Sequence, residues 1–329
     1  MGSTNSPDPT SPTSPTSPTS PSTSGPTDTA DETADETAQE TANDTDPPPP
    51  GDARVLMVVG FNNTWWPEYK VMAEGLRAAG YEVDVRSSTD DGVAYSYGDR
   101  VDGTSAGVPA VDPISYEEFR ASFEASFGAA WDPAWNEPQT IPLDGLIQDA
   151  TMEDYVALVV PGGSGSQFLR YDGDYEDLPP SNGDPAHISP EADIAAAAEA
   201  LNDLVVAALA QGSPVLAVCH AGPTPGFARV PGTEGQGPDG LGLSLLNDRQ
   251  ATGFPLDNEV LGAVGDVAQQ YAALGIEFLP GQAVVVDGPG VDLDGDGNPD
   301  GADLVVTGRS WYPEEVALGL RTMLDILEG

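Results

Sequence analysis

Residues 214–222 read Pro-Val-Leu-Ala-Val-Cys-His-Ala-Gly, and the prediction of the fold starts from this pattern. The apolar run 215–218 is typical of a short strand that is buried on both faces of a sheet. Cys219, the only cysteine of the chain, follows that run directly. A strand that turns sharply into a helix lifts one side chain above the sheet edge, where the N–H groups of the helix lower the pKa of a thiol. The stretch therefore predicts either an α/β enzyme with Cys219 as nucleophile or a structural cysteine at a strand end.

Strand and helix patterns alternate on both sides of this stretch. Strands are predicted at residues 54–60, 81–86, 155–160, 283–286 and 304–308. Helices are predicted to begin at Pro67, at Ser189 as N-cap, and near Pro313. This alternation is typical of a mainly parallel sheet with helices on both faces, in which ligands bind beyond the carboxyl ends of the strands.

Two segments depart from the alternation. Residues 1–52 hold Ser-Pro-Thr repeats and then acidic Thr-Ala-Asp-Glu repeats, without aromatic or large aliphatic side chains. We expect this segment to be a disordered tail, because it cannot bury a core. Residues 87–148 are rich in aromatic side chains but show no regular alternation. We interpret them as an insertion that caps or borders the site, or that covers apolar sheet surface.

The charge of the chain is extreme, with 54 acidic and 11 basic side chains and a formal net charge of -43. We interpret the acidity as adaptation to high salt, which screens the repulsion. The absence of a basic patch argues against nucleic-acid binding, and no apolar run is long enough to span a membrane. A single cysteine excludes an intrachain disulfide framework. No signal peptide is visible, so a cytoplasmic protein is expected, with export or cell-surface tethering through the tail as the alternative.

Two further segments are expected to meet Cys219 above the same sheet edge. The strand predicted at 155–160 is closed by Pro161-Gly162-Gly163, whose backbone N–H groups suit an oxyanion hole. Glu68 lies in the first turn after the first strand, where its carboxyl can exchange a proton with the thiol. The alternative role for Glu68 is to complement the dipole of its helix.

The order of these segments resembles the ThiJ/PfpI superfamily of the class I glutamine-amidotransferase-like fold. The matching pieces are residues 55–59 with Glu68, 154–163, 212–223, 251–255 and 304–309. The resemblance covers nearly all of residues 53–329 and implies a flavodoxin-like, three-layer α/β/α sandwich; the acidity indicates a haloarchaeal-type member. True glutamine amidotransferases are excluded, because they need a histidine well after the cysteine, and the only histidines here are His187 and His220.

The resemblance implies a role for each matching residue. Cys219 would be the nucleophile, His220 its assisting neighbour, and Glu68 the carboxylic acid near the thiol. The backbone N–H groups of Gly163 and His220 would form the oxyanion hole, with Gly162 beside them.

The resemblance leaves the third catalytic group open. The resemblance implies Asp257, with Glu259 as a rival, or else an acid from the second subunit of a homodimer. Residues 164–167 read Ser-Gly-Ser-Gln, where the chaperone/glyoxalase branch often has a histidine. The insertion at 87–148 is also long for the protease-like branch, so the substrate class stays open.

The leading interpretation is a cysteine-dependent enzyme in which Cys219 attacks a carbonyl carbon. The outcome would be glyoxalase III-like or deglycase-like lyase chemistry on small dicarbonyl compounds, or hydrolysis of amide and peptide bonds. No cofactor is expected for catalysis. The alternative is a non-catalytic domain, either a redox sensor in which Cys219 is oxidised reversibly or a chaperone-like holdase.

A second motif lies at residues 292–303 and has the spacing of a twelve-residue calcium loop. The expected oxygen ligands of a structural Ca²⁺ are Asp292, Asp294, Asp296, Asn298, Asp300 and Asp303. Gly297 stands at the sixth position, which needs a sharp turn. The alternative is a solvated acidic turn in an acidic protein.

Overall fold

The structure is a computed structural model that describes residues 53–97, 139–172, 188–254, 266–288, 305–309 and 313–329, with isolated positions 121, 124, 175 and 293. These ranges fall within one compact unit, Pro47–Gly329. The predicted tail, most of the predicted insertion and nearly all of the predicted calcium loop lie outside the described residues, and so do Asp257 and Glu259.

A seven-stranded sheet forms the centre of the molecule, in the order β11-β12-β8-β7-β1-β3-β6. All neighbouring strands are parallel except β11 and β12. The strands β3-β1-β7-β8-β12 follow the flavodoxin order, 2-1-3-4-5 when counted along the chain. The predicted fold class is confirmed. The bounds are β1 Arg54–Val58, β3 Glu82–Ser87, β6 Gly145–Leu146, β7 Ala157–Val160, β8 Val215–Val218, β11 Val284–Asp287 and β12 Val305–Gly308.

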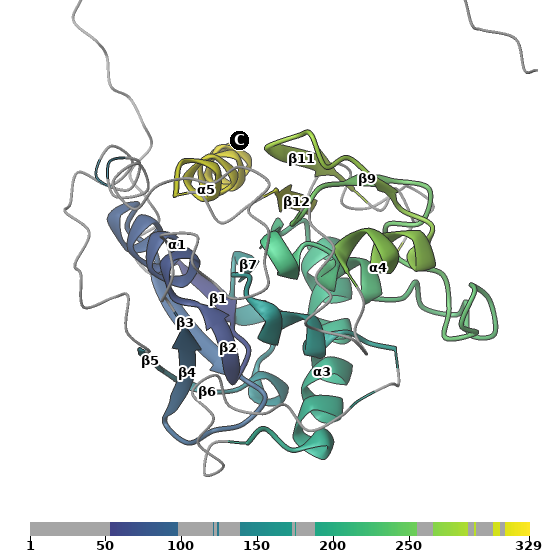
Figure 1. Ribbon diagram of the computed structural model, residues 1–329, viewed down its shortest axis with the longest axis horizontal. Helices are drawn as coiled ribbons and strands as arrows, with labels where there is room; N and C mark the ends of the chain where they lie inside the picture. Colours follow the sequence, from purple (N-terminus) through teal and green to yellow (C-terminus); the bar gives the residue numbers. More distant parts are fainter. Residues whose placement is uncertain are drawn as a thin grey trace, which may run out of the picture. The chain divides into compact units, whose positions relative to one another are not determined.

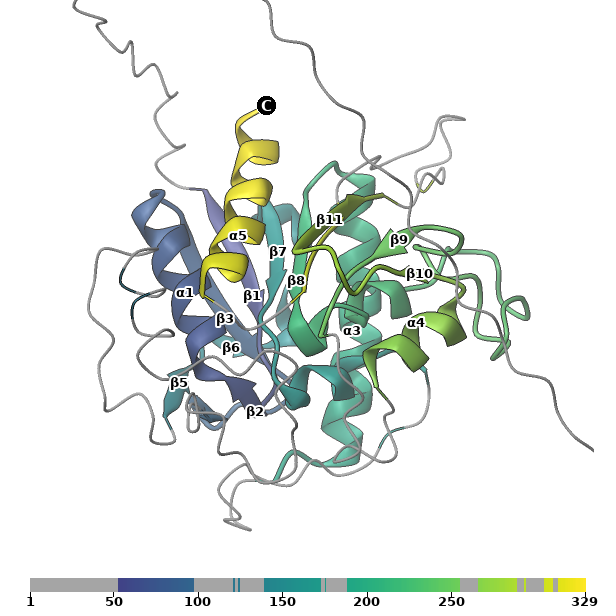
Figure 2. The ribbon, with the colours of Figure 1, turned by 45° about the horizontal axis from the view of Figure 1, so that its top comes forward.

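Helices cover both faces of this sheet (Figures 1 and 2). Helices α1 (Trp66–Ala78) and α5 (Pro313–Glu328) pack against each other on one face, and α3 (Glu191–Ala210) packs against β7 and β8 on the other. The short helix α4 (Val267–Leu274) follows later in the chain. The core lies between these layers, where β1, β7 and β8 contribute buried Val, Leu, Met and Ala side chains. None of the described helices combines the length and the apolar character needed to cross a membrane.

The start of α3 differs from the sequence expectation. Pro190, and not Ser189, is the N-cap residue, and it makes no side-chain capping bond. The Ser189 hydroxyl is instead bonded to the hydroxyls of Ser88 and Thr89, at 2.9 and 3.0 Å. It therefore ties the start of α3 to the segment after β3.

Two small sheets stand beside the central one. Strands β2 (Asn62–Trp65), β4 (Val93–Tyr97) and β5 (Thr140–Pro142) form a sheet in the order β2-β4-β5. Strand β2 was not expected from the sequence; it leads directly into α1. β4, β5 and β6 fall inside the predicted insertion, so its described part borders the segment that carries Glu68. Strands β9 (Gln250–Ala251) and β10 (Glu277–Phe278) form a parallel pair.

Short 3-10 helices fill several of the connections. They are η2 (Ile147–Asp149), η3 (Met152–Asp154), η4 (Ser164–Leu169), η5 (Cys219–Ala221) and η6 (Thr224–Phe227). Two of them begin where central strands end: η4 follows the glycines after β7, and η5 follows β8 directly. This places both at the carboxyl ends of neighbouring parallel strands.

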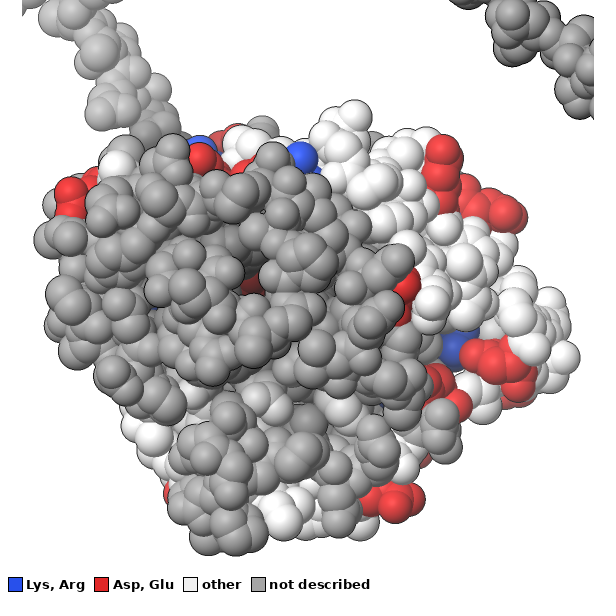
Figure 3. All heavy atoms as spheres, viewed as in Figure 1, with Lys and Arg blue, Asp and Glu red and all other residues white. Residues whose placement is uncertain are grey.

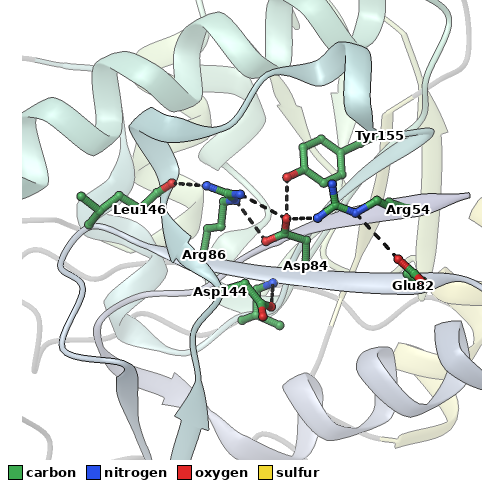
Figure 4. Close-up of polar contacts among 8 residues, drawn as sticks. Arg54, Glu82, Asp84, Arg86, Asp144, Leu146 and Tyr155 are labelled. Atoms are coloured by element: carbon green, nitrogen blue, oxygen red, sulfur yellow. Dashed lines mark hydrogen bonds and ion pairs between the residues drawn. The ribbon is translucent and has the colours of Figure 1, made fainter.

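A partly buried charged network joins β1, β3 and the residue before β7, Tyr155 (Figure 4). The Asp84 carboxylate accepts hydrogen bonds from Arg54 Nη2 at 2.5 Å, Arg86 Nε at 3.0 Å and the Tyr155 hydroxyl at 2.7 Å. Burial and Asp84 together raise the pKa of Tyr155 to about 12. Because the carboxylate is paired on both oxygens, a charge is tolerated inside the sheet.

Candidate active site

Cys219 stands at the carboxyl end of β8, where the chain turns into η5. Its backbone has φ 58°, in the left-handed region that residues other than glycine rarely adopt. Such strain is typical of a nucleophile placed on a tight strand-to-helix turn. The side chain is nearly inaccessible, with 3% of the residue exposed. The local geometry is therefore that of a nucleophile elbow with a buried thiol.

Glu68 reaches the same place from the other side of β7. It lies in the first turn of α1, after Pro67, and is fully buried. A Cβ atom placed on Gly162 would lie 2.5 Å from Glu68 Oε2 and 2.7 Å from Cys219 Cβ. Glu68, Gly162 and Cys219 are thus packed against one another at the carboxyl ends of β1, β7 and β8. The structure brings together the three segments that the sequence analysis placed at one sheet edge.

Gly163 has a conformation and a packing that require glycine. Its φ is 101°, and a Cβ there would lie 2.3 Å from the Asn63 carbonyl oxygen and 2.4 Å from Trp65 N. The Trp65 N–H donates to the Gly162 carbonyl at 3.0 Å, which fixes the turn. The N–H groups of Gly163 and His220 both interact with the Cys219 sulfur and favour its charged form. Two backbone N–H groups therefore lie close to the Cys219 sulfur.

Burial dominates the ionisation of the thiol and the carboxyl. Burial raises the pKa of Glu68 to about 8. Interactions with the Cys219 thiol and the Gly162 N–H lower this pKa, but by less. Burial, followed by the nearby Glu68, raises the pKa of Cys219 well above its ordinary value. The expectation of a lowered thiol pKa is wrong for the resting site, because desolvation and the carboxyl outweigh two N–H groups and a three-residue helix. At pH 7 both groups are neutral.

The His220 side chain faces the thiol. Its Nδ1 lies 3.4 Å from Cys219 Sγ, and the residue is 7% exposed. Burial lowers the pKa of His220 to about 4, so the imidazole is neutral at pH 7 and has a nitrogen that can accept a proton. The ring of Phe254 stacks on this imidazole, with 4.3 Å between centroids and 26° between planes. Phe254 belongs to the matching segment 251–255, and no role for it was expected from the sequence.

Other expected groups cannot be placed. Asp257, Glu259 and the set of calcium ligands lie outside the described residues. Within the described part of the chain, no three His, Cys, Asp or Glu side chains are grouped closely enough to hold a metal ion. Gln167, the last residue of the segment 164–167, is buried in η4.

Three solved structures that are similar to this chain have names of ThiJ/PfpI or DJ-1 proteins. A ThiJ/PfpI domain protein from Brachyspira murdochii is 13% identical, with a TM-score of 0.47 over 84% of this chain and 98% of that one. DJ-1beta of Drosophila melanogaster is 13% identical, with a TM-score of 0.44 over 84% of this chain and 92% of that one.

A two-domain protein from Anabaena variabilis, with DJ-1/ThiJ/PfpI-like and ferritin-like domains, is 19% identical, with a TM-score of 0.44 over 83% of this chain. This chain spans about half of that protein, 48% of its length. At these identities the likeness concerns the fold alone. A scan against protein-family models gives no match, and a search of the curated proteins gives none either.

Proposed function

We propose that this protein is a cysteine-dependent enzyme of the ThiJ/PfpI type that acts on small carbonyl compounds, with Cys219 as its nucleophile. The observation that carries the proposal is the elbow itself. At Cys219, with φ 58°, a buried sulfur meets two backbone N–H donors, a histidine nitrogen and a carboxyl group. The 3% exposure of Cys219 favours a small carbonyl substrate over an extended peptide, because a buried thiol admits only small molecules.

The chemistry begins with a neutral thiol. As Sγ attacks the carbonyl carbon, the thiol proton passes to Nδ1 of His220, the C–S bond forms, and the carbonyl electron pair moves onto oxygen. The N–H groups of Gly163 and His220 stabilise the oxyanion. Glu68, which is protonated at pH 7, then supplies the oxyanion with a proton and gives a hemithioacetal. Deglycase and amide-hydrolase reactions begin with the same addition step.

Turnover of methylglyoxal to lactate in high salt tests this proposal. We expect turnover by the wild type and a loss of at least about a thousandfold in Cys219→Ser, because removing a covalent nucleophile removes the pathway. The control is Ser213→Ala, a substitution at the other end of β8. Full retention of turnover in Cys219→Ser would contradict the proposal. If the wild type is inactive on dicarbonyl compounds but cleaves amide substrates through Cys219, the proposed reaction would be amide hydrolysis.

The redox alternative rests on the contact between Glu68 and the thiol. A protonated carboxyl with a pKa of about 8 can donate a hydrogen bond to an oxidised sulfur. Oxidation of Cys219 by dilute peroxide, seen as added oxygen by mass spectrometry in a wild type without turnover, would favour this function. The third acid, from Asp257, Glu259 or a second subunit, stays part of the proposal, as does the homodimer.

A further inference from the structure

We propose that Phe254 is the residue that positions His220 for proton transfer from Cys219. The inference rests on the proposed function, because it concerns how the histidine beside the nucleophile is held. It goes further in assigning a role to an aromatic side chain outside the Cys-His-Glu group. It also explains how the His220 imidazole, which follows the strained Cys219, is held in one plane.

The ring geometry is the first observation. The planes of Phe254 and His220 are 26° apart, and their centroids are 4.3 Å apart, which is a stacked contact. The Phe254 ring therefore covers one face of the imidazole, and the two imidazole nitrogens lie at the edge of this contact. Rotation of the imidazole out of its plane, about the Cβ–Cγ bond, would lose the stack, whereas a half-turn would keep it. The stack thus fixes the plane of the imidazole, and in that plane Nδ1 lies 3.4 Å from Cys219 Sγ.

The backbone of Phe254 holds the other partner of the same pair. Its N–H donates to the Cys219 carbonyl at 3.0 Å, and the Gly222 N–H donates to that carbonyl at 3.2 Å. Both bonds stabilise Cys219 in its left-handed conformation, φ 58°. Phe254 therefore fixes the elbow through its main chain and the imidazole through its side chain.

The residues that precede Phe254 are held by hydrogen bonds to β12 and α4. The Thr252 N–H donates to Thr307 Oγ1 on β12 at 2.9 Å, and the hydroxyl of the fully buried Tyr271 donates to the Thr252 carbonyl at 2.7 Å. A Cβ on Gly253 would lie 2.9 Å from Val267 Cγ1 and 3.0 Å from the Cys219 carbonyl oxygen. Phe254 is thus presented by a rigid support in close contact with the elbow, which is the arrangement that a positioning residue needs.

Replacement of the ring separates positioning from packing. Phe254→Leu keeps the backbone N–H and an apolar side chain but removes the planar surface, and Phe254→Tyr restores that surface. Phe278→Leu is the matched control, since the Phe278 ring lies 5.4 Å from Tyr271. If Phe254→Leu does not fold, Phe254→Met is the second ring-free variant. Two readouts are used: the rate of Cys219 alkylation by iodoacetamide, and the ¹⁵N resonances of His220, assigned with His187→Gln.

We expect Phe254→Leu to slow the alkylation of Cys219 about tenfold, which is less than the full rate contribution of a general base. We also expect it to shift the ¹⁵N resonances of His220. Phe254→Tyr is expected to return both values to within about twofold of the wild type, and Phe278→Leu to leave them unchanged. Unchanged His220 resonances in Phe254→Leu would overturn the inference, and so would an equal effect of Phe278→Leu. A wild-type thiol that resists alkylation would count against the proposed function, while the His220 resonances would still decide the role of Phe254.

Discussion

Glu68 couples the stability of the molecule to pH through a single carboxyl. The group is fully buried, and desolvation raises its pKa from 4.5 to about 8. Between these values the folded state keeps a proton that the unfolded state has released. The free energy of unfolding therefore falls as pH rises from about 4.5 to about 8, by roughly 5 kcal/mol in total, and levels off above that pH.

Glu68→Gln is expected to remove this part of the pH dependence, because an amide does not titrate. The variant should match the wild type at pH 5 and exceed its unfolding free energy at pH 8. Urea unfolding at both pH values in the same salt measures the difference, in which other titrating groups cancel. Parallel pH curves for the two proteins would show that Glu68 is ionised in the folded state and contradict the argument.

The sequence predicted those site residues that are marked by a pattern in the neighbouring residues, and it missed contacts between residues far apart in the chain. Cys219 and Gly163 stand at the ends of apolar runs, and strand ends in a parallel sheet meet at one edge, so their approach followed from the pattern. The stacking of Phe254 on His220 joins residues far apart in the chain and leaves no periodic signal. Asp84 was missed for the same reason: its partner Tyr155 lies 71 positions away. The raised thiol pKa depends on the depth of burial, which local pattern does not give.

At the scale of elements, the turn after β7 depends on Gly162 being a glycine. Gly162→Ala would put a Cβ within 2.7 Å of Cys219 Cβ and of the Val218 carbonyl oxygen, and 2.5 Å from Glu68 Oε2. We expect overpacking to cost about 1–3 kcal/mol of unfolding free energy and to change the alkylation rate of Cys219. Denaturant unfolding and alkylation of the same samples measure the two effects.

Gly281→Ala is the control for this substitution. A Cβ on Gly281 meets nothing within 4 Å, and we expect a change within about 0.5 kcal/mol. Equal stability of the two variants would mean that β1, β7 and β8 are not packed as tightly at their ends as the structure has them.

The helices and strands differ in how many residues their sequence patterns cover. All the central strands except β6, together with α1, α3 and α5, were predicted within a few residues, because buried runs and helix starts extend over several positions. β2 was not, because Asn62–Trp65 has no apolar alternation and pairs with β4 only through the fold. Pro190 displaced Ser189 as N-cap because the serine hydroxyl has partners from the segment after β3. The calcium loop at 292–303 stays a prediction.

At the scale of the whole molecule, like charges oppose the compact state. The formal net charge is -43, and acidic side chains prevail among the described charged residues on the face in Figure 3. Arginines are used sparingly and several are paired, such as Arg229 with Asp239 at 2.6 Å and Arg86 with Asp84 at 3.0 Å. The remaining acidic side chains have few cations to offset them, so their repulsion is left to the solvent to screen.

Salt is therefore expected to stabilise this protein by screening. The Debye length falls from about 10 Å at 0.1 M to about 3 Å at 1 M, so the thermal midpoint should rise steeply with KCl over that range and then level off. Sucrose, which favours compact states without screening charge, is the control. A midpoint that is flat in KCl, or that rises equally in sucrose, would contradict the argument. A rise in KCl but not in sucrose would show that repulsion among acidic side chains lowers the thermal midpoint. Variants would then have to be compared at the same ionic strength, because the midpoint of each one depends on it.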